Sequence, residues 1–247
     1  MRLRTVSFRY SRRDPWILQD LGLTLEPGSV VEVTGRNGAG KSTLLRLLAG
    51  IVPPTRGTIA DRPAAVGYAP DVFPVDQPFT VTAYLAHMSR IRSASPAVIG
   101  ELAARLGATH LLDKPLGDLS KGSAQKIGLI QALLVPPGLL ILDEPFAGLD
   151  EQTRTALPAI IDEIASAGGT VVVSDHQNQL RDLPGAEHWL VDDGTVTPGA
   201  RLPSPREDAS PGGAPRQTII EVIVDADDAD EVEQKLRADG YLTRRSS

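Results

Sequence analysis

The stretch "GRNGAGKST", residues 35–43, separates two segments of different periodicity and decides the fold class. The segment before it is typical of a strand that ends at Thr34, and the segment after it is typical of a helix that begins at Lys41. Three glycines let this backbone curl so that its N–H groups point inward at phosphates, while Lys41 can reach the terminal phosphates and Ser42 can offer a hydroxyl to Mg²⁺. The spacing therefore predicts a nucleotide-phosphate site made by Gly35, Arg36, Asn37, Gly38, Ala39, Gly40, Lys41, Ser42 and Thr43.

Two adjacent acids follow a strongly apolar stretch in "LLILDEP", residues 139–145. This pattern is typical of a buried strand that carries Asp143 to its end, where the carboxylate could hold a Mg²⁺-bound water. Successive side chains on an extended backbone point in opposite directions, so Glu144 could face the attacking water instead. The alternative is that the two acids only cap the next turn.

A histidine ends the next apolar strand, "TVVVSDH", residues 170–176. In a parallel sheet, His176 would lie at the same edge as Asp143 and beside bound phosphates. Its imidazole could then hydrogen-bond the γ-phosphate and help to fix the water for Glu144. Taken alone, a histidine in this position is an ordinary turn residue.

Strand and helix signals alternate along most of the chain, with a helical insert at residues 78–135. Apolar strands alternating with helices imply a mostly parallel sheet covered on both faces. Pro158 is expected to kink one helix, and a Pro-Gly turn at residues 27–28 to join two strands. Strands are expected within residues 3–10, 21–35, 57–60, 65–70, 138–145, 170–176 and 188–196, and helices within 41–50, 78–135 and 150–169.

Composition narrows the classes of protein. The 247 residues are 41% hydrophobic, so one sizeable α/β core is expected. The formal net charge of -6 argues against a nucleic-acid partner, although five arginines lie in the first thirteen residues. No cysteine is present, which excludes thiol catalysis, and no apolar run is long enough to span a membrane.

The last part of the chain differs in composition from the rest. Residues 201–217 are rich in Pro, Gly and charge, which is typical of a linker, and residues 218–247 are expected to form one strand and one helix. Thirty residues are too few for an independent core. We therefore expect a domain of residues 1–200 followed by a small extension that regulates or stabilises the assembly.

"LGDLSKGSAQKIGLI", residues 116–130, begins as a polar segment and continues with helix-spaced apolar residues. The N–H groups at such a helix start attract anions, which suggests a phosphate. Serine and glycine are also ordinary capping residues, so this segment alone leaves both interpretations open.

Together these motifs resemble, in order and spacing, the ATP-binding subunit of ATP-binding cassette (ABC) transporters. "GRNGAGKST" and "LLILDEP" look like the family's two nucleotide motifs, "LSKGSAQK" its signature, "AGLD" its dimer-contacting loop and "VSDH" its switch histidine. The resemblance implies an α/β fold: a P-loop NTPase core of the ABC type with a mostly parallel sheet, an N-terminal antiparallel β subdomain and a helical subdomain.

The resemblance also implies a Mg²⁺-dependent ATPase that binds two ATP molecules in a homodimer or in a heterodimer with a second ATP-binding subunit. Lys41, Glu144 and His176 would be catalytic, and Asp150 would lie in the dimer loop. Ser120, Lys121 and Gly122 of the signature would contact ATP across the interface. Separate transmembrane permease subunits would be the partners, which implies a cytoplasmic protein held at the inner face of the cell membrane.

Two departures from the family pattern affect these expectations. The signature commonly reads Leu-Ser-Gly-Gly-Gln, whereas this chain has Lys121 and Ser123 at its third and fifth positions. Asp71 stands where a Gln is common, and it could bind Mg²⁺ along with Ser42 and Asp143. Many exporter-type members resemble the chain in both respects, so export is expected; alternatively, Asp71 only caps its loop and Gln77 supplies the amide.

Tyr10 matches the family's aromatic residue that stacks on adenine, with Trp16 as a rival. Two other functions remain open: a soluble ABC ATPase in cytosolic assembly, repair or translation, and an ATP-binding regulatory module without turnover. Glu144 and His176 together disfavour the regulatory module. A GTPase is disfavoured because no Asn-Lys-x-Asp motif is present.

Overall fold

The structure, a computed structural model, describes residues 1–175 and 185–199. The chain divides into a first unit, Met1–Leu202, and a second unit, Pro203–Ser247. The predicted linker and the predicted strand-helix extension lie outside the described residues. All of the described helices and strands belong to the first unit.

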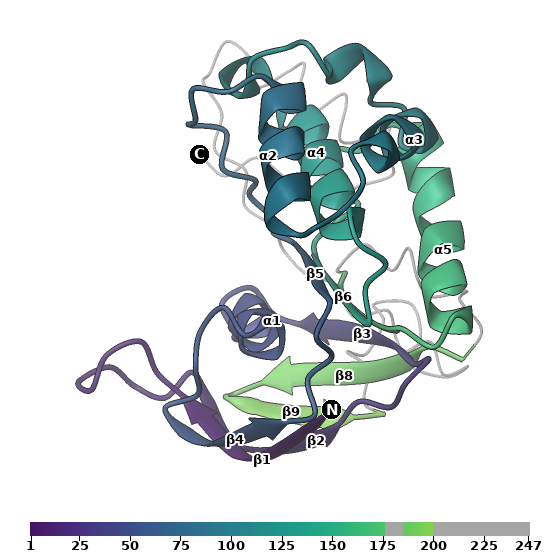
Figure 1. The fold of residues 1–247 in the computed structure, drawn as a ribbon. Coiled ribbons are helices and arrows are strands. Elements are labelled where there is room, and N and C mark those ends of the chain that lie inside the picture. Colours follow the sequence, from purple (N-terminus) through teal and green to yellow (C-terminus); the bar gives the residue numbers. More distant parts are fainter. Residues whose placement is uncertain (176–184, 200–247) are drawn as a thin grey trace, which may run out of the picture. The chain divides into compact units, whose positions relative to one another are not determined.

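A six-stranded sheet forms the centre of this unit, in the order β5-β6-β7-β3-β8-β9 (Figure 1). All neighbouring pairs are parallel except the final hairpin between β8 and β9. Every residue of β6 and β7 is buried, as expected for strands whose two faces are both covered. The strands are β3 (Val30–Gly35), β5 (Val66–Ala69), β6 (Leu139–Asp143), β7 (Thr170–Ser174), β8 (Glu187–Asp192) and β9 (Thr195–Pro198).

A separate antiparallel sheet has the order β2-β1-β4, with β1 at Arg2–Phe8, β2 at Leu18–Thr24 and β4 at Arg56–Ala60. The Pro-Gly turn at 27–28 therefore leads from a strand of this sheet to a strand of the other and does not close a hairpin. The cause is visible in the burial of the two strands: β2 alternates between buried and exposed residues, whereas the first four residues of β3 are all buried.

Helices cover the central sheet on both faces, and most of them belong to the predicted insert. The helix expected at 150–169 forms and continues through Pro158, where a buried apolar side that includes Leu157, Ile160 and Ile161 anchors it. The helices are α1 (Lys41–Ala49), α2 (Val81–Ile91), α3 (Ala97–Arg105), α4 (Lys121–Leu133) and α5 (Glu151–Ser166), with 3-10 turns η1 (Thr109–Leu111) and η2 (Leu116–Asp118).

Alternation along the central strands divides the core in two. In β6, Leu140 and Leu142 pack into a cluster with the helical insert and α5, whereas Leu139 and Ile141 pack into a cluster with the antiparallel sheet and α1. Figure 1 shows α1 beside the sheets and α2, α3, α4 and α5 gathered apart from it. The period of two continues to Asp143, which therefore faces the side of α1.

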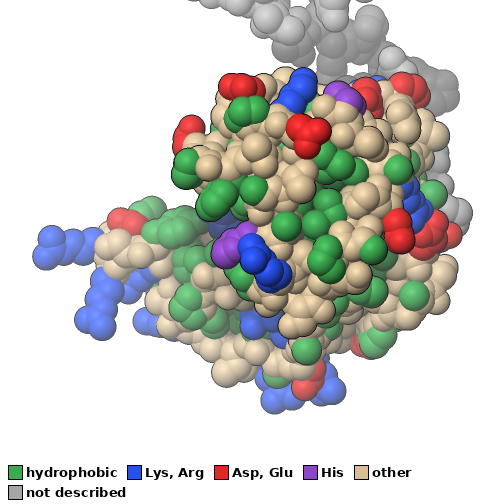
Figure 2. All heavy atoms as spheres, turned by 45° about the horizontal axis from the view of Figure 1, so that its top comes forward, with side chains coloured by type: hydrophobic (Ala, Val, Ile, Leu, Met, Phe, Trp, Pro, Cys, Tyr) green, Lys and Arg blue, Asp and Glu red, His purple; other side chains and the backbone are tan. Residues whose placement is uncertain are grey.

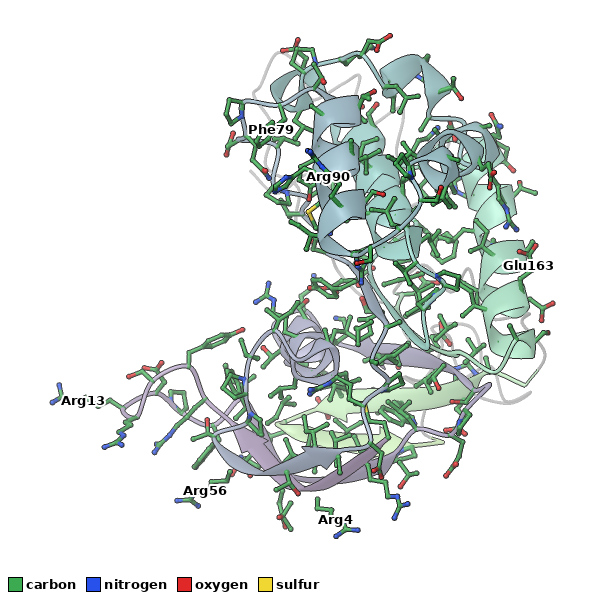
Figure 3. All side chains as sticks on the ribbon, viewed as in Figure 1. Arg4, Arg13, Arg56, Phe79, Arg90 and Glu163 are labelled. Carbon is green, nitrogen blue, oxygen red and sulfur yellow. The ribbon has the colours of Figure 1, made fainter. Side chains whose placement is uncertain are left out.

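The arginine-rich start of the chain lies on and next to β1. Figure 2 shows basic side chains at the tip of the loop that projects after this strand, and Figure 3 shows Arg4 and Arg13 pointing outward at separate places. Arg2, Arg4, Arg12 and Arg13 are exposed, Arg9 is half-buried, and Arg4 and Arg13 do not converge on one point. Among the described residues, no helix is long and apolar enough to cross a membrane.

Candidate functional site

The glycine-rich loop joins β3 directly to α1. Gly40 precedes the helix with φ of 106°, and no side chain caps the first turn of α1, so the N–H groups of that turn have no side-chain acceptor. Gly35 has φ of 147°, and a Cβ there would lie 2.3 Å from the carbonyl oxygen of Val191. The loop thus presents backbone donors at a helix start, which is the arrangement that binds phosphate.

Lys41 is buried inside this loop. Its ammonium donates to the carbonyl oxygens of Gly35 at 2.8 Å and Arg36 at 3.2 Å. These bonds hold the loop curled around the lysine, with a positive charge at its centre. The arrangement places a cation where an anionic group would meet the backbone donors.

Three hydroxyl and carboxyl groups meet where α1, β6 and β7 come together. The Oδ1 atom of Asp143 accepts from the Ser42 hydroxyl at 3.2 Å and from the Ser174 hydroxyl at 2.8 Å. Asp143 is buried, and these two bonds compensate for the loss of water around its carboxylate. Sequence reasoning identified Ser42 and Asp143 but missed Ser174, although "TVVVSDH" places a serine at the end of the adjacent parallel strand.

Glu144 follows β6 with a left-handed backbone, φ of 51°. Its N–H donates to the Ser174 hydroxyl at 2.9 Å and lies 3.2 Å from the Ser174 carbonyl oxygen. The Ser174 hydroxyl therefore connects the two acids: it accepts from the backbone N–H of Glu144 and donates to the carboxylate of Asp143. The prediction that Glu144 continues the extended backbone of the strand was wrong. The strand ends at Asp143, and Glu144 lies in a left-handed turn that follows it.

The pKa of Glu144 is raised to about 7, chiefly by burial; Lys41 acts against this rise, and the charges of Asp175, Asp143 and Asp71 add to it. A carboxylate with a pKa near neutrality is suited to accept a proton from water at physiological pH. Asp175, buried beside the end of β7, is a second contributor that sequence reasoning missed. His176, the predicted switch histidine, lies outside the described residues.

The signature segment forms a capped helix start. The Ser120 hydroxyl accepts from the N–H of Ser123 at 3.2 Å and donates to the Ser123 hydroxyl at 3.0 Å. Ser120 is therefore the N-cap of α4, and Ser123 is its hydrogen-bond partner. Gly122 packs against the backbone of Gly148, so closely that a Cβ on it would lie 2.0 Å from the Gly148 carbonyl oxygen.

Asp150 makes its described contacts within the subunit. One carboxylate oxygen accepts from the backbone and hydroxyl of Thr153 at 3.0 and 2.7 Å, which caps α5, and the other accepts from the buried Lys126 of α4 at 2.7 Å. Hydrogen bonds from Lys126 and Thr153 lower the pKa of Asp150 to about 2. The signature helix and the loop before α5 are thus joined both here and at Gly122.

Asp71 lies in the loop between β5 and α2 and pairs with Lys121 at 3.5 Å, so the two departures from the family pattern contact each other. Among the described residues, no group of three or more histidine or acidic side chains is close enough to hold a metal ion, so Asp71 does not form such a cluster with Asp143 and Glu144. The Gln77 amide donates to the Pro74 carbonyl oxygen at 3.0 Å, within its own loop.

Tyr10 follows β1, and 54% of its surface is exposed. Its hydroxyl lies 3.3 Å from that of Thr43, the last residue of the glycine-rich loop motif. Trp16 instead lies under the guanidinium groups of Arg9 and Arg56, 4.4 and 5.0 Å from its ring centre. The geometry favours Tyr10 over Trp16 as the aromatic neighbour of the loop.

Comparison with known proteins identifies this arrangement. The family described as "ABC transporter" matches residues 18–147, more than half of the chain. The chain belongs to the ABC transporter family. This match covers the glycine-rich loop, the signature and both acids, Asp143 and Glu144.

Relatives of this ABC chain include zinc import ATP-binding proteins named ZnuC. The one from Cereibacter sphaeroides is 39% identical over 158 residues, which is 64% of this chain and 65% of the relative. The one from Halorhodospira halophila is 39% identical over 176 residues, 70% of this chain and 66% of the relative. The matched part of the chain thus spans just under two thirds of the length of these relatives.

Solved structures agree with the ABC fold. An ATP-binding subunit of an ABC transporter is 26% identical with a TM-score of 0.71, over 80% of this chain and 88% of that one. An inward-facing ABC transporter assigned to the metal-chelate type is 27% identical with a TM-score of 0.65, over 80% and 82% of the two chains. The predicted α/β core, antiparallel β subdomain and helical subdomain are confirmed.

The expectation of export finds no support in the names of these relatives, which are those of import proteins. The expectation depended on Asp71 and Lys121. In the structure these residues contact each other beside the nucleotide motifs.

Proposed function

We propose that this chain is the ATP-binding and ATP-hydrolysing subunit of an ABC transporter and powers translocation through separate transmembrane permease subunits. The observation that carries the proposal is the hydrogen-bonded group of Ser42, Asp143, Ser174 and Glu144 beside a lysine-filled phosphate loop. A nucleotide-binding loop alone would fit a sensor. A carboxylate with a pKa near 7 next to it fits hydrolysis.

The residues divide the work as follows. The N–H groups at the start of α1 and the ammonium of Lys41 bind the β- and γ-phosphates and stabilise the charge that develops on them. Glu144 accepts the proton of the attacking water. Ser174 positions Glu144 through its backbone N–H and holds Asp143 in place.

Mg²⁺ is the expected cofactor, and the donor set fits it. Mg²⁺ keeps several waters and takes one or two carboxylates together with the phosphates of its substrate. The hydroxyl of Ser42 and the carboxylate of Asp143 meet at the phosphate loop and would hold the ion. When bound, Mg²⁺ supplies charge neutralisation between the phosphates. Asp71 remains a proposed third ligand, which would first have to leave Lys121.

Two such subunits would bind two ATP molecules between them, as a homodimer or with a second ATP-binding subunit. Ser120, Lys121 and Gly122 of one subunit would then approach the γ-phosphate bound to the other. Lys121 is exposed and adds a positive charge to that approach. The names of the relatives favour import, with a metal ion such as zinc as the transported substrate.

The enzymatic half of the proposal is tested with the purified full chain, by measuring phosphate release from ATP with Mg²⁺ and with excess EDTA. Asp143→Asn should abolish turnover, whereas Arg90→Met, at an exposed position of α2 labelled in Figure 3, should not change it. Equal turnover in wild type and Asp143→Asn would contradict the assignment of the site.

The transport half is tested in cells. The neighbouring reading frame should encode a permease with several apolar spans, and deletion of the gene for this chain should reduce uptake of radioactive zinc at low external concentration. Complementation by wild type but not by Asp143→Asn would link uptake to ATP hydrolysis. Unchanged uptake of zinc would exclude zinc as the substrate, and a soluble partner in place of a permease would exclude transport.

A further inference from the structure

Arg46 lies one turn after the glycine-rich loop on α1 and has no part in the mechanism described above. Its guanidinium donates to the Tyr10 hydroxyl at 3.1 Å. The same hydroxyl lies 3.3 Å from that of Thr43. Because arginine can only donate, the tyrosine oxygen accepts from Arg46, and either hydroxyl can donate in the contact between Tyr10 and Thr43.

The Tyr10 ring is therefore fixed at two ends. Its hydroxyl is held by Arg46 and Thr43, and the ring stands edge-on to Phe8, with centres 4.9 Å apart and planes at 86°. A 54% exposed aromatic side chain ordinarily has considerable freedom, yet here both its polar end and its hydrocarbon body have partners.

Arg46 also lies near Tyr68 of β5. The Tyr10 hydroxyl, to which the guanidinium donates, raises the pKa of Arg46 most, and Tyr68 raises it second. The guanidinium thus joins α1 to the Tyr10 side chain, which follows β1 of the antiparallel sheet. Because α1 begins at the glycine-rich loop, an arginine on this helix can hold the exposed ring at a constant distance from the loop.

We propose that Arg46 is a positioning residue for the nucleotide base: it holds the Tyr10 ring ready to stack on a purine whose phosphates occupy the 35–43 loop. This inference rests on the proposed function of that loop. A ring that is already in place costs less conformational entropy when a base stacks on it. Arg46 therefore sets the affinity for the base, while the loop and Lys41 set the affinity for the phosphates.

The test compares a ligand that has a base with one that lacks it. Titration calorimetry on the full chain would measure dissociation constants for Mg·ATP and for Mg·tripolyphosphate in wild type, Arg46→Met and Arg46→Lys. We expect Arg46→Met to weaken ATP binding about fivefold to tenfold, in line with one lost charged hydrogen bond and partly lost stacking, and to change tripolyphosphate binding less than twofold. Arg46→Lys keeps a donor and should recover part of the loss.

Two further variants complete the test. Tyr10→Phe keeps the ring and removes the acceptor, so it should reproduce the effect of Arg46→Met, and the double variant should be no weaker than either single one. Arg90→Met on α2 is the control for loss of a surface arginine (Figure 3). If Arg46→Met does not fold, Tyr10→Phe carries the comparison.

The outcomes separate this inference from the proposed function. Equal weakening of ATP and tripolyphosphate, or additive effects of the two single changes, would overturn the positioning role and leave the loop assignment intact. Unchanged ATP affinity in Arg46→Met would do the same. If wild type bound neither ligand, the proposed function would fail and this inference with it.

Discussion

Replacing Gly122 by Ala should destabilise the protein, against the usual effect of this substitution in a helix. Alanine is favoured over glycine in helix interiors by up to about 1 kcal/mol. At this position, however, the new Cβ would lie 2.0 Å from the Gly148 carbonyl oxygen and 3.0 Å from its carbonyl carbon. Both neighbours are backbone atoms, and a shift of more than about 1 Å would be needed to reach van der Waals contact.

Overpacking of this kind costs about 1–3 kcal/mol, which outweighs the helical gain because Gly122 is only the second residue of α4. We expect a net loss of about 1–2 kcal/mol and a melting temperature lower by roughly 2–8 °C. Gly100→Ala is the matched control: Gly100 lies inside α3, and a Cβ there meets nothing within 4 Å, so this variant should gain stability. Chemical denaturation of both variants decides, and a Gly122→Ala protein as stable as Gly100→Ala would refute the reasoning.

Three other predictions concern the chemistry of the site. Lys41→Ala should weaken ATP binding about tenfold or more by removing the cation inside the loop, and calorimetry showing wild-type affinity would contradict this. The kcat/KM for ATP should rise as the pH increases through about 7, because Glu144 must be ionised to accept a proton; a profile that is flat between pH 5.5 and 8.5 would argue against Glu144 as the base. Asp71→Asn should move this rise to lower pH, because the charge of Asp71 raises the pKa of Glu144. The same variant should need a higher Mg²⁺ concentration for activity. If only Gln77→Ala shifts the Mg²⁺ titration, Gln77 and not Asp71 acts on the metal.

The sequence was sufficient to predict the parts of the site that are carried by local patterns. The glycine spacing of residues 35–43 lies between a strand and a helix in the structure as predicted, and β6 and β7 are parallel neighbours, so Asp143 and the end of β7 share one edge. These features follow from short-range chemistry: turn-forming glycines, continuous apolar runs in buried strands and the period of the helix.

Other parts of the site depend on contacts between distant segments, which the sequence alone did not reveal. Ser174 joins the two acids only because β6 and β7 align at Asp143 and Ser174. The close approach of Gly122 to Gly148 and the pair of Lys126 with Asp150 join segments that local periodicity treats separately.

The most direct test of the account is the behaviour of Glu144→Gln with saturating Mg·ATP. Glutamine keeps the shape of the side chain but cannot accept the proton of the attacking water, so ATP binding should remain while turnover falls at least about 100-fold. Light scattering on the same sample should show an ATP-dependent increase from the 26.3 kDa monomer to a dimer that does not dissociate. Wild-type turnover in Glu144→Gln would contradict the assignment of the catalytic base, and with it the proposed mechanism.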